Sequence, residues 1–358
     1  KTKALTYKDL ALKFCLFSKA LVIKYVESAR YAMKIDQIPK FVFGLFILGF
    51  LSLRAAYAED LPIRVVKTEE ARIDVFVGDE LFTSYHYGLG FHKPIFYPLK
   101  SPAGNPITRG YPIESGIPGE AHDHWHHESL WLTYGNVNGT DFWAKQGARR
   151  GVSESGKIRH TGFSRLEGGK KGHLEASADW ITPEGKVILR QRSQVVFRAG
   201  HNWRLMDLTI ELTAHGQKVT FGDTKEGMFG IRVTPALREN HTGVYLNASG
   251  QQKEAGVWGK RSPWVALRGK VRDEQLTLAI FNHPESTGFP TFWHARGYGL
   301  FAANPFGKID FEKGSEPLNF ALHPGESAVF RYRILIHSDK LTGEELEKKF
   351  QDFVRVGE

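Results

Sequence analysis

The chain has 358 residues, of which 24% are charged, with a formal net charge of +9 and a single cysteine, Cys15. Residues 1–58 hold ten Lys and Arg against three Asp and Glu, so residues 59–358 carry a net charge of only +2. This near-neutral balance gives no support to nucleic-acid binding. The absence of cysteine after residue 58 excludes disulfides, thiol nucleophiles and cysteine metal ligands from that part of the sequence.

The N-terminal segment has the pattern of a secretory leader. The first methionine, Met33, is followed by basic residues, the apolar run Phe41–Leu53 and the small-residue sequence Ala56-Tyr57-Ala58. We therefore predict a signal peptide over 33–58 that is cleaved after Ala58, with 1–32 as non-native upstream sequence. The apolar run is shorter than the roughly 20 residues that span a bilayer. A periplasmic or secreted protein without stable membrane insertion is expected; an uncleaved anchoring leader is the alternative.

Residues 59–358 show strand signals along most of their length. Leu205–Leu212 alternates apolar and polar residues with the period of a half-buried strand. Hairpins are predicted around the turns at 78–80 and 182–186. The predicted strands are Arg72–Val77, Leu81–Tyr87, Ser129–Tyr134, His173–Ile181, Val187–Phe197, Leu205–Leu212, Gly227–Val233, Trp264–Arg268, Leu276–Phe281, Gly299–Ala303 and Ser327–Ile336.

One helix is predicted at the C-terminus. Thr342 is a typical N-cap residue, and Glu344 and Glu345 place negative charge in the first turn of the segment that follows. Many antiparallel strands without a strand–helix–strand rhythm predict an all-β fold: a large antiparallel two-sheet β-sandwich, as a single domain over 59–358, with a short C-terminal helix. Two smaller β-domains are the alternative. The irregular segment Lys93–Glu128 is long enough to indicate a functional loop.

The segment His122–Glu128 is the strongest functional signal, because it holds four histidines, an aspartate and a glutamate within seven residues. Imidazole carries protons near neutral pH and binds metals. His127 is the candidate catalytic acid or base, and His124 is a candidate substrate ligand. Because alternate residues of an extended strand share a face, His124 and His126 with Glu226 form an alternative divalent-metal site. A solvated polar loop is the alternative without function.

The segment Asp223–Gly227 places Lys225 beside Glu226, next to a glycine that allows close approach of a ligand. Glu226 is a candidate catalytic base. Lys225 and Arg232 are candidates for binding a hydroxyl, keto or carboxylate group of a substrate. An exposed turn that carries a Lys and a Glu is the structural alternative.

The segment Phe281–Gly307 is the third dense region, with histidines separated by aromatic residues. His294 is the candidate second acid or electrophile in catalysis. His283, Arg296 and Asn304 are candidate substrate-binding residues. Histidines that are satisfied in the core of a sheet are the structural alternative.

All eight tryptophans follow residue 58, and Trp131 and Trp293 are candidates to stack a pyranose ring. The same residues equally suit a large β core. The sequence has no phosphate-binding glycine fingerprint and no nucleophile elbow of the Gly-x-Ser-x-Gly type.

Five segments together resemble the PmoA-like family of secreted bacterial proteins, long classed as a domain of unknown function. They are Lys93–Gly110, Asp123–His127, Leu130–Trp143, Phe221–Val233 and Trp293–Gly307. The resemblance implies a galactose-mutarotase-like β-supersandwich and a role in carbohydrate processing, without an established reaction. It does not imply a methane oxygenase, because the sequence after residue 58 has no apolar run of membrane-spanning length.

These observations predict a periplasmic carbohydrate-active enzyme, namely a hydrolase, lyase or epimerase. His127 and Glu226 are expected to exchange protons with the sugar, with help from His294. The expected partner is a small-molecule carbohydrate, and no cofactor is predicted. The alternatives are a metal-dependent enzyme with the histidine cluster as divalent-metal ligands and a non-catalytic carbohydrate-binding protein.

Overall fold

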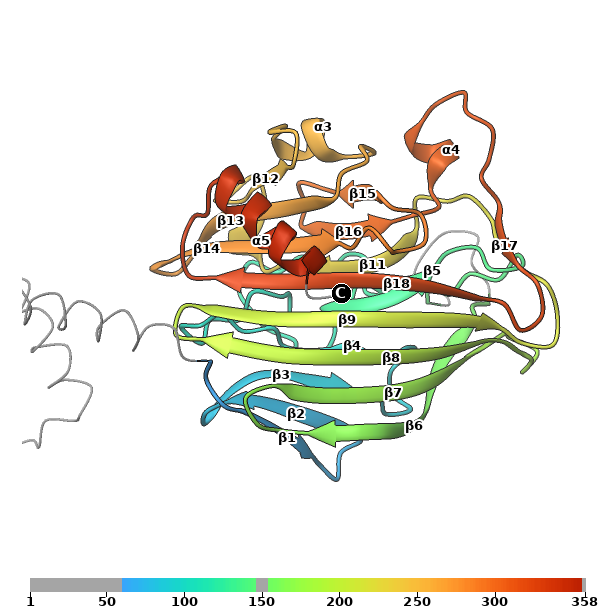
Figure 1. Ribbon diagram of the computed structural model, residues 1–358, viewed down its shortest axis with the longest axis horizontal. Coiled ribbons are helices and arrows are strands. Elements are labelled where there is room, and N and C mark those ends of the chain that lie inside the picture. The colour runs from blue at the N-terminus through green and yellow to red at the C-terminus, as the bar shows by residue number, and fades with distance from the viewer. Residues whose placement is uncertain (1–59, 146–153, 356–358) are drawn as a thin grey trace, which may run out of the picture. The chain divides into compact units, whose positions relative to one another are not determined.

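Antiparallel strands dominate the computed structural model, which describes residues 60–145 and 154–355 (Figure 1). The strands form two eight-stranded sheets and one two-stranded sheet. The predicted all-β fold with two large antiparallel sheets is therefore confirmed. The predicted signal peptide, its cleavage site and the upstream sequence lie outside the described residues. None of the described helices is long and apolar enough to cross a membrane.

The first large sheet has the strand order β1-β2-β3-β4-β5-β11-β16-β15. Strand β11 lies near its middle and pairs antiparallel with both β5 and β16. This order brings together segments that are far apart in the sequence. The strands are β1 (Ile63–Lys67), β2 (Arg72–Val77), β3 (Glu80–His86), β4 (Ile95–Phe96), β5 (Leu130–Tyr134), β11 (Gly227–Arg232), β16 (Leu300–Asn304) and β15 (Phe292–Ala295).

The second large sheet has the order β12-β13-β14-β18-β9-β8-β7-β6. Its strands are β12 (Val244–Asn247), β13 (Trp264–Val271), β14 (Glu274–Asn282), β18 (Ser327–His337), β9 (Trp203–Ala214), β8 (Val187–Gly200), β7 (Gly172–Ile181) and β6 (Lys157–Glu167). The short sheet pairs β10 (Val219–Phe221) with β17 (Phe320–Leu322). The described helices are the 3₁₀ turn η2 (Pro235–Leu237), α3 (Lys253–Val257), α4 (Lys308–Phe311) and α5 (Gly343–Arg355).

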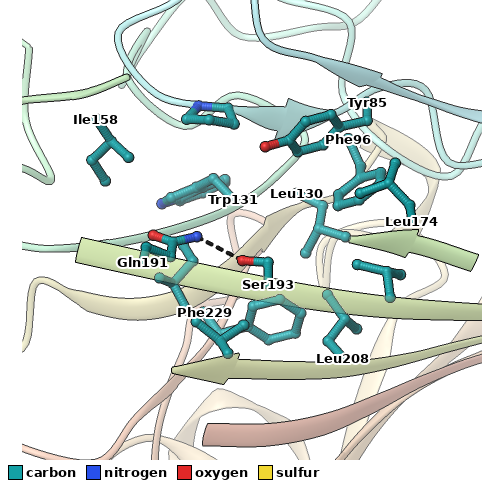
Figure 2. Close-up of a pocket in the computed structure, with 14 residues that line it drawn as sticks. Tyr85, Phe96, Leu130, Trp131, Ile158, Leu174, Gln191, Ser193, Leu208 and Phe229 are labelled. Atoms are coloured by element: carbon teal, nitrogen blue, oxygen red, sulfur yellow. Dashed lines mark hydrogen bonds between the residues drawn. The ribbon is translucent and has the colours of Figure 1, made fainter. Parts of the chain in front are cut away.

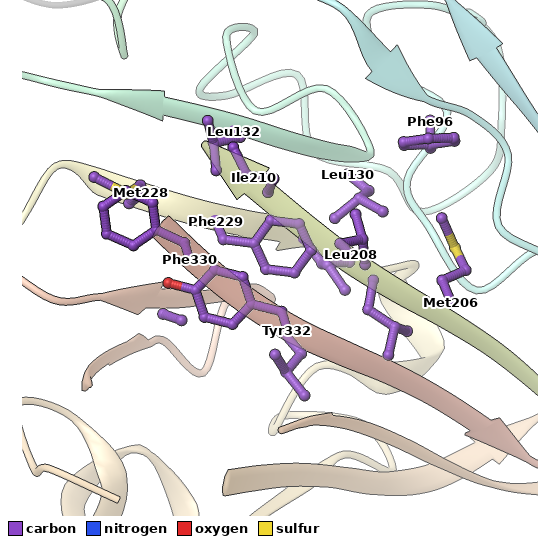
Figure 3. Close-up of a cluster of buried hydrophobic side chains, with 14 of the residues drawn as sticks. Phe96, Leu130, Leu132, Met206, Leu208, Ile210, Met228, Phe229, Phe330 and Tyr332 are labelled. Atoms are coloured by element: carbon purple, nitrogen blue, oxygen red, sulfur yellow. The ribbon is translucent and has the colours of Figure 1, made fainter. Parts of the chain in front are cut away.

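The main core lies between the two large sheets. In β9 the side chains of Met206, Leu208, Ile210 and Leu212 are all buried and alternate with half-buried polar residues, as the sequence predicted. Phe229 of the first sheet and Tyr332 of the second stack with ring centroids 4.7 Å apart (Figure 3). This contact joins the sheets at the centre of the core.

The outer face of the second sheet is covered by α5. Leu346, Phe350 and Phe353 of the helix share a hydrophobic cluster with Trp264 and Phe281 of the sheet. The helix begins with reciprocal hydrogen bonds. The Glu345 amide donates to the Thr342 hydroxyl (3.2 Å), and the Thr342 amide donates to the Glu345 carboxylate (2.8 Å). The predicted capped C-terminal helix is therefore confirmed.

Strands β6 and β15 were not predicted, because neither shows the alternation of apolar and polar residues that indicates a strand. Strand β6 is an edge strand with two register irregularities and many half-buried or exposed residues, so it lacks a clear alternation. Strand β15 is fully buried on both faces and only four residues long, and therefore has no alternation to detect. The segment 93–128 is irregular apart from β4, as predicted.

A small cavity of about 40 Å³ lies between the sheets. Apolar side chains such as Leu130, Leu208 and Phe229 line most of it, and the Gln191 amide donates a hydrogen bond (2.8 Å) to the Ser193 hydroxyl at its edge (Figure 2). Its volume suits a water molecule rather than a substrate. No carboxylate or imidazole lines it among the described residues, so the chemistry of this protein has to be sought elsewhere.

Candidate functional site

A pocket of about 280 Å³ gathers the titratable residues that the sequence singled out. It is built by the loop that precedes β5, the turn that precedes β11, and β15 with the turn that follows it. Because β5, β11, β16 and β15 are consecutive neighbours in the first sheet, these three segments meet at one place. The lining residues are His124, His126, His127, Lys225, Glu226, His294, Arg296 and Tyr298.

All three candidate catalytic residues, His127, Glu226 and His294, therefore line one pocket. Sequence reasoning did not single out Tyr298, which lies two residues after Arg296. It carried no signal of its own, because a single tyrosine in an aromatic-rich segment is equally typical of a core. Burial raises the pKa of the Tyr298 hydroxyl to about 12, so at neutral pH it is a neutral donor.

Near-parallel rings connect the pocket to the core. The His124 ring stacks against Tyr298, with centroids 5.2 Å apart, and against His127, at 5.0 Å. The His127 ring in turn stacks against Trp131 at 5.3 Å. Trp131 is only 2% exposed and does not line the pocket. It supports the His127 ring. The prediction that the Trp131 ring stacks against a pyranose is therefore wrong, because the ring is buried.

Arg109 holds the histidine-bearing loop and was not predicted as a site residue. Its fully buried guanidinium donates to the carbonyl oxygens of Asp123 (2.9 Å), His124 (2.9 Å) and His127 (3.2 Å). It also donates to the Asp123 carboxylate at 2.7 Å. A five-donor guanidinium suits this task, because an irregular buried loop leaves many carbonyl oxygens without partners.

Arg232 lies beneath the pocket, fully buried, and does not line it. Its guanidinium donates to the Asp123 carboxylate at 2.7 Å and to Nδ1 of His127 at 3.2 Å. The structure therefore makes Arg232 a residue that positions His127, in place of the predicted substrate contact. A sequence cannot distinguish these roles, because both require the same charged side chain near the site.

The contact with Arg232 fixes the tautomer of His127. A guanidinium can only donate, so Nδ1 of His127 accepts and the proton of the neutral ring resides on Nε2. This Nε2–H is buried and has no hydrogen-bond partner among the described residues. Burial, with further contributions from His126 and Arg232, lowers the pKa of His127 well below its usual value. His127 is therefore a neutral hydrogen-bond donor at physiological pH.

His294 has the opposite tautomer. Its Nδ1 contacts the carbonyl oxygen of Lys225 at 2.9 Å, and because a carbonyl only accepts, Nδ1 carries the proton. Nε2 of His294 then has a lone pair that can accept a proton. Burial lowers the pKa of His294 to about 3, although the bond to the carbonyl opposes that shift. One neutral imidazole in the pocket donates through Nε2 and the other accepts.

Glu226 is held at the pocket by close backbone packing. A Cβ atom on Gly135 would lie 2.7 Å from Cβ of Glu226 and 2.9 Å from its carbonyl oxygen, so only glycine fits there. Oε1 of Glu226 lies 3.6 Å from Nζ of Lys225. The turn is also fixed from the other side, where the Lys225 amide donates to Asp310 (2.6 Å) and Asn304 donates to the Thr224 carbonyl (2.8 Å).

Arg296 closes the other side of the pocket. Its Nε lies 2.8 Å from Oε1 of Glu254, and the amide of Gly297 donates to Oε2 of the same carboxylate at 2.6 Å. These contacts fix the turn after β15. The side chain of Arg296 remains about one-third exposed, so its guanidinium can also contact a ligand in the pocket.

Three predicted substrate ligands lie away from the pocket. Trp293 points from β15 into the core between the sheets, opposite to His294, and its indole donates to the Ser262 carbonyl at 2.9 Å. His283 packs against Phe353 of α5. Asn304 braces the turn that carries Glu226 and does not line the pocket. The alternation of a strand and the packing of a distant helix decide these positions.

The alternative metal site is not assembled in the part of the chain that the structure describes. Within 60–145 and 154–355, no group of three His, Cys, Asp or Glu side chains has a geometry that could hold a metal ion. One reason lies at His124, whose Nδ1 is directed at the Asp123 carboxylate at 2.9 Å and whose ring is stacked between neighbours. The predicted set His124, His126 and Glu226 is thus not supported as a ligand set.

Several solved structures are similar to this chain at low sequence identity. The galactosidase domain of an α-galactosidase–sucrose kinase is 10% identical with a TM-score of 0.40, covering 78% of this chain and 42% of that chain. A putative aldose 1-epimerase from Escherichia coli K12 is 12% identical, with a TM-score of 0.33 and coverages of 77% and 99%. A galactose mutarotase related enzyme from Lactobacillus acidophilus is 9% identical, with a TM-score of 0.32 and coverages of 78% and 100%.

None of the curated proteins compared with this chain matches it significantly. The model of DUF6807, described as a family of unknown function, matches residues 72–351. This match covers most of the two large sheets and every residue that lines the pocket. The chain belongs to the DUF6807 family.

Proposed function

We propose that this protein is a carbohydrate-active enzyme that uses acid–base chemistry by Glu226, His127 and His294. The observation that supports this proposal is the meeting of these three residues in one pocket, with opposite tautomers on the two imidazoles. The saccharide substrate follows from the sequence resemblance to the PmoA-like family, a designation that remains a prediction. The pocket offers the many donors and acceptors that sugar hydroxyls require.

Each group has a distinct role in the proposed mechanism. The Glu226 carboxylate is the base that removes a proton from the substrate. The buried Nε2–H of His127 donates to the oxygen on which negative charge develops, as a neutral imidazole does in a pre-organised site. The carboxyl group of Glu226 then gives this proton to the leaving oxygen in an elimination, whereas in an epimerisation water protonates the opposite face of the carbon. Nε2 of His294 accepts a hydrogen bond from a second hydroxyl group of the substrate. Lys225 and Arg296 bind oxygen atoms of the substrate at the rim.

The pocket favours elimination or epimerisation over hydrolysis. Hydrolysis of a glycosidic bond ordinarily uses two carboxyl groups that flank the bond. Among the described residues that line the pocket, Glu226 is the only carboxylate. A base paired with a neutral hydrogen-bond donor instead suits proton transfer next to an oxygen that becomes negatively charged.

The test is a substrate panel followed by NMR in D₂O, which reports both product formation and deuterium uptake. For a substrate that is turned over, Glu226→Gln and His127→Gln are each expected to lower kcat by about 10²-fold or more. Glu69→Gln, at an exposed position in the turn before β2 and outside the pocket, is the matched control and should retain full activity. Full turnover by both site variants would exclude this mechanism.

The predicted signal peptide leads us to propose that the enzyme acts in the periplasm or outside the cell. Expression of the full chain in a bacterial host, followed by fractionation and N-terminal sequencing, tests this. A mature protein that begins at Glu59 is expected outside the cytoplasm. A chain that stays in the cytoplasm with residues 33–58 intact contradicts the proposal.

A further inference from the structure

We infer that a second pocket, beside the first, binds a negatively charged sugar unit. This groove has a volume of about 670 Å³, and we call it the Trp125 groove. Trp125 lines it, whereas the neighbours of Trp125, His124 and His126, line the catalytic pocket. A single three-residue segment therefore borders both pockets.

The Trp125 groove carries an excess of positive charge. Among the residues that the structure describes, three cations, Lys145, Lys157 and Arg159, line it together with one carboxylate, Glu154. Lys157 is exposed and forms no ion pair with any residue that the structure describes. Arg159 donates to the carbonyl oxygen of Phe91, which orients its side chain, and it forms no ion pair with any of the described residues. An anionic ligand would supply the missing negative charge.

Lys145 shares its carboxylate partner, Glu128, with a second lysine. Nζ of Lys145 lies 2.5 Å from Oε1 of Glu128, and the fully buried Lys93 contacts Oε2 of the same carboxylate at 2.9 Å. Two lysine side chains thus share one carboxylate, so Glu128 is not a partner of Lys145 alone. This buried arrangement also fixes Lys145 at the wall of the groove, so its contribution to anion binding costs little side-chain entropy.

The aromatic lining indicates a sugar rather than a simple inorganic anion. The half-buried indole of Trp125 and the ring of Phe91 both line the groove, and Nζ of Lys145 lies 5.3 Å from the centroid of the Trp125 ring. An indole provides a flat apolar surface against which the C–H face of a sugar packs. The ligand chemistry is therefore a saccharide that bears a uronate carboxylate or a sulfate ester.

Occupation of the groove and of the catalytic pocket by one oligosaccharide rests on the proposed function. Binding of a charged sugar in the groove alone does not depend on the proposed function. We therefore test binding by isothermal titration calorimetry, using the full chain and three probes: tetragalacturonate, a sulfated tetrasaccharide and neutral cellotetraose. Both charged probes or one of them should bind, with an affinity that falls as salt is raised, and cellotetraose should bind at least about tenfold more weakly.

Variants locate the binding site. Lys157→Glu reverses an exposed, unpaired charge and is expected to weaken binding of the charged probe by about tenfold or more. Lys170→Glu makes the same change at an exposed lysine outside both pockets and should leave the affinity unchanged. Glu226→Gln should also leave binding in the groove intact, so failure of the proposed catalysis and failure of this inference are distinguishable.

Three results would overturn the inference. They are equal affinity for the neutral and charged probes, no measurable binding of either charged probe, and equal affinities of Lys157→Glu and Lys170→Glu. A preference between the two charged probes identifies the anionic group. Trp125→Ala adds a second measurement, because loss of the stacking surface should weaken the sugar probes while leaving the weak binding of free sulfate or acetate unchanged.

Discussion

At the scale of single residues, the two histidines of the pocket illustrate how partners decide chemistry. His127 and His294 are both buried and neutral, but a guanidinium faces Nδ1 of one and a carbonyl oxygen faces Nδ1 of the other. One ring is thereby a donor at Nε2 and the other an acceptor. The residue type was visible in the sequence, whereas the role depends on which group lies opposite Nδ1.

The tautomer of His127 is testable directly. Arg232→Met removes the donor to Nδ1, so the ring is expected to populate both tautomers, with a visible change in the ¹⁵N spectrum of its imidazole. We expect kcat to fall by about tenfold or more, with a smaller effect on KM, because the donor to the developing charge is no longer fixed. Arg232→Lys, which keeps the charge, should restore part of the activity. An unchanged spectrum of the Met variant would refute the assignment.

The buried histidines also predict how stability depends on pH. The pKa of His294 is about 3 in the folded protein, and that of His127 also lies well below its usual value, so the unfolded chain binds protons first as pH falls. Stability is therefore full above about pH 6.5 and declines below it, by about 1.4 kcal/mol per pH unit for each such histidine.

Urea unfolding at pH 7.0 and 5.5 provides the comparison for His294. Other histidines, including the half-buried His92 and His160, have pKa values lowered to about 4 and contribute with the same sign. The informative quantity is therefore the difference in the pH dependence of stability between the parent protein and a variant that lacks His294. His294→Gln should lose about 1.4 kcal/mol per pH unit of this dependence. An identical pH dependence in the variant and the parent would contradict the assignment of a neutral His294.

At the scale of elements, the turn before β11 is the part that positions Glu226. Gly135→Ala would place a Cβ atom 2.7 Å from Cβ of Glu226, and the backbone carbonyl at 2.9 Å cannot move aside easily. The expected result is displacement of the turn, loss of most activity and a stability decrease of about 1–3 kcal/mol. Activity assays and urea unfolding measure the two effects.

Gly162→Ala is the matched control for that change. Nothing lies within 4 Å of a Cβ atom built on Gly162, which is in an edge strand, and its backbone conformation does not require glycine. This variant should keep both activity and stability. If Gly135→Ala behaved like the control, close packing of Gly135 against the turn would not be what positions Glu226.

At the scale of the whole molecule, the two faces of the sandwich have separate tasks. The candidate pocket is built on segments of the first sheet, and α5 packs on the second sheet through Phe350 and its neighbours. Phe350→Ala is therefore expected to lower the free energy of unfolding by about 3–5 kcal/mol while kcat/KM stays unchanged under conditions where the protein is folded. A large change in kcat/KM of the folded variant would show that the two faces are coupled.

The sequence by itself determined the fold class, most of the strands and the C-terminal helix. Alternation in β9 and the Thr342 cap of α5 are local patterns, and they predicted the all-β class and the terminal helix. The histidine cluster, Glu226 and His294 also stood out, because the structural needs of a β fold do not call for so many histidines and charged residues in short segments. The leader over 33–58 and its consequence for localisation remain predictions.

Only the tertiary structure decided how these parts cooperate. The strand order β5-β11-β16-β15 brings His127, Glu226 and His294 together, and pairing between strands so far apart in the chain leaves no local trace in the sequence. Burial likewise turned Arg232 and Trp131 into supports of His127 and revealed Arg109 as the residue that holds the loop. The physical reason is that periodicity is a property of neighbours along the chain, whereas a site is made by neighbours in space.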